Sequence, residues 1–297
     1  MSKVSSRIII GVWPLSGDFG PVSPTNYEEC IKKAIDLGIN TFDTAPNYGN
    51  GYSESALGLI LDGQKNIKIN TKFGSNPFGH KSFSAEDLKK SFYNSLSRLR
   101  TEKINYLFLH NPRKEVNDFN DIIILLEDLK SQNLINDYGI SIAKGFEYKN
   151  INSFNGIQLD CNLLYLDDLN KYCSKKNKIF ARSPLASGIL SGKLNLDTKF
   201  HKTDYRSSWL KGNRLTSILT RLNVIKKNTQ GISLPSLARK FLFQNKNIDH
   251  VIFGVKKPTH IDDIIFDFKS PILDQDIIDK IKNLEENNFY QTDKNGF

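Results

Sequence analysis

The chain has 297 residues, a length that excludes a peptide-sized scaffold. Of these residues 39% are hydrophobic and 25% are charged, a composition that excludes a disordered chain. Its three cysteines lie at wide spacings that fit neither a disulfide framework nor a paired zinc or redox motif, so reduced thiols and a cytoplasmic location are expected. No apolar stretch is long enough for a membrane-spanning helix, and the first one, residues 8–12, is too short for a signal-peptide core.

The net charge of +9 at pH 7 is distributed unevenly along the chain. Residues 171–257 contain nineteen Lys and Arg residues but only three acidic ones. A solvated lysine-rich surface would give this pattern, and so would a binding site for a phosphate-bearing ligand. Nucleic acid is not expected as a partner, because no recognised nucleic-acid-binding motif accompanies the charge.

Short apolar runs enriched in β-branched residues alternate with longer segments of helical period, which predicts repeated βα units. In chain order, the predicted strands are residues 7–12, 40–44, 67–71, 104–109, 137–141, 156–161, 179–182 and 250–253. The first helix is predicted to start at Pro24 behind a Ser23 cap and to end before Gly38. Ser84 and Ser233 are predicted to cap two later helices.

Eight such alternations use the whole length of the chain without a linker or a composition break. The prediction is therefore an α/β fold with one domain over residues 1–297, a (β/α)8 TIM barrel. An open doubly wound sheet is the alternative. It is disfavoured because no glycine-rich turn follows the first strand.

Four ionisable residues fall at or just after the ends of three consecutive predicted strands, where a barrel of this kind places its catalytic groups. They are Asp43, Tyr48, Lys72 and His110. Lys72 is a cation that could lower the pKa of the Tyr48 phenol, Asp43 would hold the ammonium in place, and His110 would orient a carbonyl. This set predicts a general acid acting on a carbonyl. Hydride would have to come from a nicotinamide cofactor, because no side chain supplies one.

Other interpretations of these residues remain open. Each of the four taken singly is more often a cap, a rim residue, a surface charge or a loop histidine. A lyase in which Lys72 forms a Schiff base is a second enzyme class, although Asp43 would keep that lysine charged. No metal site is predicted, since the other histidines fall at no ligand-like spacing.

Residues 38–45, followed by Tyr48-Gly49, Ser53-Glu54 and Leu57-Gly58, resemble the first motif of the aldo-keto reductase family, and the resemblance extends over essentially the whole chain. It implies an NAD(P)H-dependent oxidoreductase whose tetrad is Asp43, Tyr48, Lys72 and His110, with Tyr48 as the acid. A cofactor-binding sensor or accessory subunit on the same barrel, with little turnover, is the non-enzymatic alternative.

The resemblance also implies a set of cofactor contacts. Ser141 and Gln158 would bind the nicotinamide carboxamide, whereas Ile142 stands where the family often has Asn, and Arg182 would stack on the ring. NADP(H) is favoured over NAD(H), because the adenosine-side segment offers Lys256 and Lys257 to a 2′-phosphate. The remaining implied contacts, for the pyrophosphate and the adenosine side, are Ser183, Pro184, Leu185, Ser187, Gly188, Lys193, Gly254, His260 and Asp263.

The substrate is expected to be a small aldehyde or ketone, and the chain is expected to act as a monomer without a membrane partner. A long loop, residues 185–214, is predicted to fold over the pyrophosphate. The residues predicted to line or close the substrate pocket are Trp13, Phe73, Asn111 and Trp209, together with Phe289, Tyr290 and Phe297 in the tail.

Overall fold

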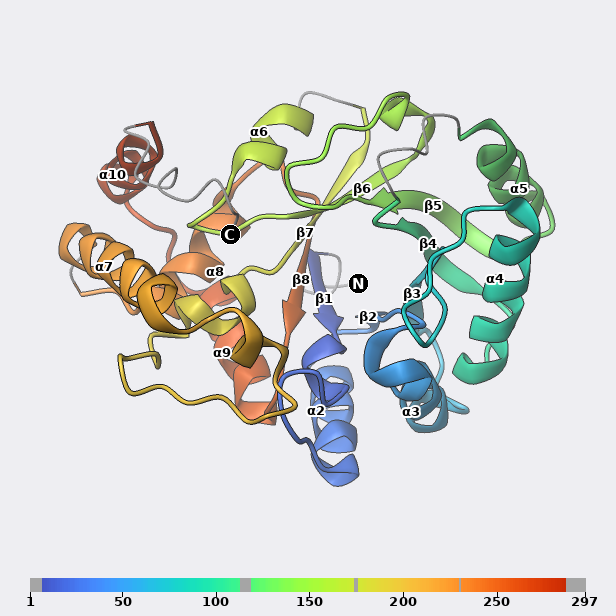
Figure 1. Cartoon of the computed structure of the whole chain (residues 1–297), viewed down its shortest axis with the longest axis horizontal. Helices are drawn as coiled ribbons and strands as arrows, with labels where there is room; N and C mark the ends of the chain where they lie inside the picture. Colours follow the sequence, from blue (N-terminus) through green and yellow to red (C-terminus); the bar gives the residue numbers. More distant parts are fainter. Residues whose placement is uncertain (1–6, 113–118, 174–175, 230, 287–297) are drawn as a thin grey trace.

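The computed structural model describes residues 7–112, 119–173, 176–229 and 231–286. Eight parallel strands close into a barrel in chain order, with β1 paired to β8, as predicted (Figure 1). The strands are β1 (Ile8–Gly11), β2 (Thr41–Asp43), β3 (Lys68–Phe73), β4 (Ile104–His110), β5 (Ile135–Ser141), β6 (Gly156–Asp160), β7 (Lys178–Arg182) and β8 (His250–Gly254).

Helices surround the barrel in Figure 1 and cover the outer faces of the strands. The predicted caps are confirmed: the side chains of Ser23, Ser84 and Ser233 each accept a hydrogen bond from the first turn of the helix that follows. The helices are α2 (Pro24–Asp36), α3 (Tyr52–Leu61), α4 (Ala85–Leu99), α5 (Asn120–Ser131), α6 (Asp167–Tyr172), α7 (Gly212–Asn228), α8 (Leu234–Gln244), α9 (Pro258–Lys269) and α10 (Gln275–Glu286).

The two faces of the strands contribute side chains to two different hydrophobic cores. The larger core lies between strands and helices and contains outward-facing residues such as Phe42, Leu107 and Leu109. The barrel interior holds a separate small cluster that includes Tyr106, Phe108 and Phe180. Because successive side chains of a strand point to opposite faces, every second residue enters the barrel, and the last inward positions form its C-terminal mouth.

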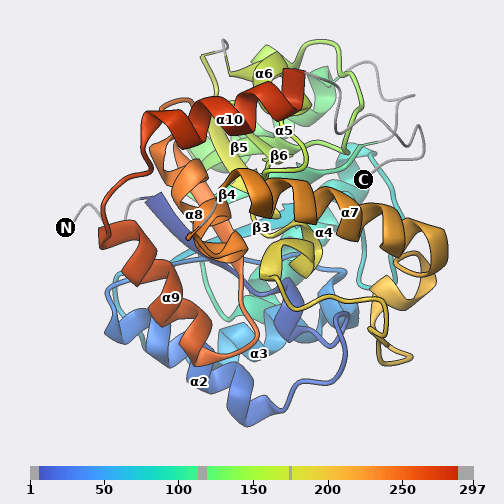
Figure 2. The ribbon, with the colours of Figure 1, turned by 90° about the vertical axis from the view of Figure 1, so that its left-hand side faces the viewer.

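Segments that lie far apart in the sequence close the ring of helices. α9 lies beside α2 in Figure 2, and Lys33 of α2 forms an ion pair of 2.8 Å with Asp262 of α9. On the other side of α2, the buried Glu54 of α3 accepts hydrogen bonds from Thr71 of β3, at 2.6 Å, and from Arg98 of α4, at 2.7 Å. These bonds fix the start of α3 relative to the strand that carries Lys72.

Within the described ranges, no helix combines the length and the apolar character that crossing a bilayer requires.

Candidate active site

A buried ion pair lies at the C-terminal end of β2 and β3. Nζ of Lys72 is 2.6 Å from Oδ1 of Asp43, and it donates a second hydrogen bond of 2.7 Å to the backbone oxygen of Thr44. Asp43 is 3% exposed and Lys72 is 1% exposed, so solvent does not screen the pair. Burial by itself would lower the pKa of Lys72, but Asp43 and Tyr48 raise it above its ordinary value, so the ammonium stays charged at neutral pH.

Tyr48 lies next to this pair, in the short helical turn η2 (Tyr48–Gly51) that follows β2. Nζ of Lys72 is 4.9 Å from the centroid of the Tyr48 ring, and Trp13 stacks on Tyr48 with the ring centroids 5.6 Å apart. Burial raises the pKa of Tyr48, and Lys72 offsets only part of that increase. The expected net lowering of this pKa is therefore wrong for the chain alone, because burial outweighs the cation. The phenol keeps its proton at neutral pH, which a proton donor requires.

His110 ends β4 and faces the same mouth, with its ring edge-to-face to Tyr48 at a centroid distance of 6.3 Å. Burial lowers the pKa of His110 well below its ordinary value, and Lys72, Arg182 and Lys81 lower it further. The imidazole is therefore neutral at physiological pH. Its Nδ1 is buried and has no hydrogen-bond partner among the described residues, which leaves a polar atom at the mouth of the barrel for a ligand to satisfy.

A chain of hydrogen bonds runs from the ion pair across the barrel. Gln158 donates to Asp43 at 2.8 Å and accepts from Ser141 at 3.0 Å. Arg182 then donates to Ser141 at 2.6 Å and to Asp160 at 2.8 Å. Burial would raise the pKa of Asp160, but the Arg182 guanidinium brings it below its ordinary value, so the two form a charged pair. The predicted carboxamide ligands and the predicted stacking residue thus belong to one connected network.

A pocket of about 970 Å³ opens over this network, within the range usual for ligand sites. Lys72 and Ser141 are buried and do not line it. The predicted residues that line it are Trp13, Asp43, Tyr48, His110, Asn111, Gln158, Arg182, Ser183, Pro184, Leu185, Ser187, Gly188, Lys193, Gly254, Lys256, Lys257, His260 and Asp263.

Two expectations about the substrate wall differ from the structure. Phe73 is fully buried in the core between strands and helices, because it follows the inward-facing Lys72 and therefore points outward. The prediction that Phe73 lines the pocket is wrong. Trp209 lines a separate, smaller cavity. The tail residues Phe289, Tyr290 and Phe297 lie outside the described residues.

The loop after β7 has an unusual backbone on the pocket side. Ser183, Ala186 and Ser187 all adopt positive φ, at 57°, 47° and 57°, and Gly188 follows at 88°. Non-glycine residues rarely adopt this conformation, and such strain concentrates where a loop binds a ligand. This loop is therefore a candidate for holding a ligand in the pocket.

Basic residues gather further along the same pocket. Lys193 and Lys257 are exposed and line the pocket together with His260, and both act with burial to lower the pKa of His260. Lys256 instead donates a hydrogen bond of 2.8 Å to the backbone oxygen of Phe19, so it holds the loop after β1 in place. Lys193 and Lys257 are thus better placed than Lys256 to receive a phosphate.

The long loop predicted over residues 185–214 reaches across the pocket to the loop after β1. The backbone of Tyr205 donates to Asp18 at 2.9 Å, and Asp204 forms an isolated bridge with Phe19. Sequence reasoning missed Tyr205 and Arg206, which line the pocket, because nothing in the loop's local pattern indicates where it turns inward. It also missed Asp160, although this residue lies two positions after Gln158 on the same strand and therefore on the same face.

Comparison with known proteins agrees with the fold. The family model of the Aldo/keto reductase family matches residues 7–286, and the chain belongs to this family of oxidoreductases. The chain is 25% identical over 272 residues to the aldo-keto reductase YhdN of Bacillus subtilis, with 86% of this chain and 82% of that one covered.

Two further similarities bear on fold and function. A protein of Schizosaccharomyces pombe named as a putative voltage-gated potassium channel subunit beta is 26% identical over 289 residues, with 86% of this chain and 82% of that one covered. The solved structure of a glycerol dehydrogenase from Gluconobacter oxydans superimposes with a TM-score of 0.80 at 23% identity, covering 98% of this chain and 94% of that one. This structural likeness shows the shared barrel fold.

Proposed function

We propose that the chain reduces an aldehyde or a ketone to an alcohol, with NADPH as the hydride donor and Tyr48 as the general acid. The observation that carries this proposal is the buried pair of Asp43 and Lys72 next to Tyr48, whose phenol faces the same pocket as the neutral His110. When bound, a reduced nicotinamide supplies the hydride that side chains cannot provide.

The side chains at the mouth of the barrel would transfer the proton and position the carbonyl. Tyr48 Oη passes its proton to the carbonyl oxygen of the substrate, and the Lys72 ammonium stabilises the resulting phenolate. Asp43 holds the ammonium within 2.6 Å and keeps it charged. The neutral His110 orients the carbonyl through a hydrogen bond.

Residues of the same pocket would hold the cofactor. Ser141 and Gln158 are placed for the carboxamide, with Arg182 beside them at the ring. The strained loop from Ser183 to Gly188 suits the pyrophosphate, and Lys193 and Lys257 near His260 favour a 2′-phosphate and hence NADPH over NADH. A cytoplasmic monomer acting on a small carbonyl compound remains our prediction.

The Schiff-base alternative receives no support from the geometry. A lysine that attacks a carbonyl must be neutral, and the pKa of Lys72 is raised beside Asp43. The sensor alternative is favoured by one observation, the similarity to the channel subunit of S. pombe. Tight NADPH binding without turnover over a broad aldehyde panel would support that second function.

Replacement of Tyr48 tests the proposal directly. NADPH and NADH are first titrated against tryptophan fluorescence, and oxidation of the reduced cofactor is then followed with a panel of aldehydes. We expect Tyr48→Phe to reduce kcat by at least about a hundredfold, the low end of general-acid catalysis, with NADPH affinity nearly unchanged. The control is Tyr52→Phe, because Tyr52 is 41% exposed and does not line the pocket. Full activity of Tyr48→Phe would rule out its role as the acid.

A further inference from the structure

The side chain of Asp18, in the loop after β1, connects two segments of the active site without lining the pocket itself. Its Oδ2 accepts a hydrogen bond of 2.8 Å from the indole Nε1 of Trp13 and one of 3.3 Å from the backbone N–H of Gly49. The Ser16 hydroxyl contacts the same oxygen at 2.8 Å. One carboxylate oxygen therefore joins the loop after β1 to the turn η2, which begins at Tyr48.

The Trp13 indole is the side chain that this carboxylate orients. It belongs to the short turn η1 (Trp13–Leu15) and lines the pocket. Its ring stacks on Tyr48 with the two planes 20° apart, and Phe19 and Tyr205 pack against it at centroid distances of 4.8 and 5.1 Å. Aromatic contacts are weakly directional, whereas the hydrogen bond at Nε1 fixes which edge of the indole faces the carboxylate.

The turn that carries the Tyr48 phenol depends on contacts from outside itself. Gly49 and Asn50 adopt positive φ, at 55° and 54°, so the turn is not regular helix. The backbone oxygen of Ser16 packs against Gly49, where an added Cβ would lie 2.6 Å from it. An irregular turn keeps one conformation only where neighbouring segments hold it, and here the loop after β1 does so through Ser16 and Asp18.

We propose that Asp18 is a positioning residue for the acid Tyr48. Its carboxylate fixes the Trp13 indole against the phenol ring, and through Gly49 it fixes the backbone of the turn that carries the phenol. This inference rests on the proposed function, because it needs Tyr48 as the proton donor. A general acid must lie within hydrogen-bond reach of the atom that it protonates, so a displaced phenol slows proton transfer. Cofactor affinity should persist, because Asp18 does not line the pocket.

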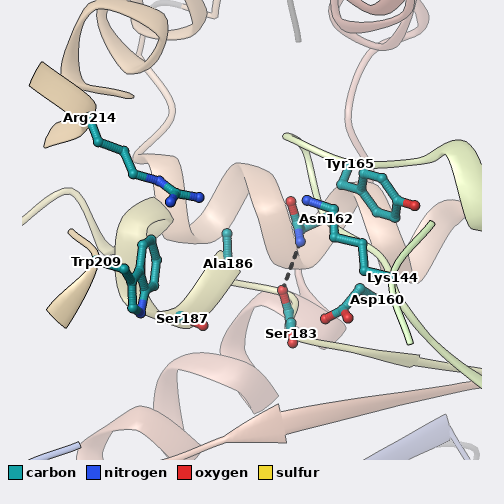
Figure 3. A pocket seen from close by; sticks show the side chains of 9 residues that line it. All are labelled: Lys144, Asp160, Asn162, Tyr165, Ser183, Ala186, Ser187, Trp209 and Arg214. Carbon is teal, nitrogen blue, oxygen red and sulfur yellow. Dashed lines mark hydrogen bonds between the residues drawn. The ribbon is translucent and has the colours of Figure 1, made fainter. Parts of the chain in front are cut away.

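Fluorescence tests whether Asp18 holds the indole. The chain has two tryptophans, and Trp209 lines the smaller cavity shown in Figure 3, so Trp209→Phe leaves Trp13 to be observed alone. In this background we expect Asp18→Ala to increase the amplitude of the subnanosecond decay of tryptophan anisotropy by at least about twofold, because the indole gains local motion. The control is Asp197→Ala, which removes the same charge from an exposed position of the long loop. An unchanged decay in Asp18→Ala would overturn the proposal.

Kinetics test whether this contact positions the acid. Asp18→Ala should lower kcat for aldehyde reduction by about tenfold and leave the Kd for NADPH within about threefold of the wild-type value. Asp18→Asn keeps an acceptor oxygen for the indole and should retain kcat within about threefold. Rates are measured at a temperature where circular dichroism shows each variant to be folded. An unchanged kcat in Asp18→Ala, equal losses in the two variants, or a loss of NADPH affinity as large as that of kcat would contradict a positioning role.

A double-variant cycle shows whether Asp18 acts through Trp13. Trp13→Phe removes the same hydrogen bond from its other partner and should by itself lower kcat by at least about threefold, which keeps the proposal testable should Asp18→Ala fail to fold. In the Trp13→Phe background, Asp18→Ala should lower kcat by less than about threefold further. A full tenfold loss there would mean that Asp18 does not act through the indole.

The anisotropy measurement needs neither cofactor nor substrate. Its result is therefore independent of whether the chain reduces carbonyls, whereas the Tyr48→Phe variant tests the proposed function without reference to Asp18.

Discussion

Adjacent side chains of β3 point to opposite faces of the strand. Lys72 enters the barrel and pairs with Asp43, whereas Phe73 points outward and is fully buried in the core between strands and helices. The same period of two places Gln158 and Asp160 together on β6. Applied to the sequence alone, this period of two would have excluded Phe73 from the pocket. It would also have added Asp160 to the hydrogen-bond network around Gln158.

The protonation states of Tyr48 and His110 predict a flat pH profile. The pKa of Tyr48 is raised above its ordinary value of 10.0, and that of His110 is lowered well below 6.5, so both groups are neutral between these limits. We expect kcat/KM for carbonyl reduction to vary by less than about twofold between pH 7 and pH 9. Initial rates at constant ionic strength measure this profile. A titration with a midpoint inside the window would contradict these assignments.

Charge reversal at Lys193 and Lys257 tests the proposed preference for NADPH over NADH. Lys257→Glu and Lys193→Glu should each weaken NADPH binding by about tenfold or more, because in the proposed site each lysine makes a charge-assisted contact to the 2′-phosphate. NADH binding should change much less, and fluorescence titrations with both cofactors measure the difference. Lys227→Glu, on the exposed side of α7, is the control for net charge. Equal losses for NADPH and NADH would remove the argument for a phosphate contact.

At the scale of elements, α3 packs against the end of α4 at a single glycine. A Cβ at Gly58 would lie 2.5 Å from the backbone oxygen of Arg98 and 2.7 Å from the carbonyl carbon of Leu99, and backbone atoms cannot move aside as a flexible side chain can. The resemblance seen in the sequence included Gly58, but only the packing explains the need for glycine there.

Gly58→Ala should therefore destabilise the chain by about 1–3 kcal/mol, the usual cost of overpacking. Denaturant unfolding followed by circular dichroism measures the change. Leu59→Ala serves as the control, because Leu59 is 57% exposed on the same helix and its loss should cost less than about 0.5 kcal/mol. A neutral Gly58→Ala would mean that the two helices can separate without penalty.

For the whole molecule, a cofactor that bridges several strand ends should stabilise the fold. The pocket draws its walls from segments as far apart as Gly11 and Ile264, and binding to the native chain alone adds about 2.7 kcal/mol at a cofactor concentration one hundred times the Kd. Thermal unfolding should thus shift upward with NADPH and, at equal concentration, less with NADH. The absence of a shift with either cofactor would contradict the proposed site.

The sequence by itself determined the barrel and the four residues at its mouth. Strand period, serine caps and the order of β and α segments are local properties, and in a parallel barrel they oblige Asp43, Tyr48, Lys72 and His110 to meet at one end. Only the tertiary structure decided that burial outweighs Lys72 in the pKa of Tyr48. It also decided the path of the long loop and the existence of the smaller cavity that Trp209 lines, because desolvation and loop contacts depend on packing between segments distant in the chain.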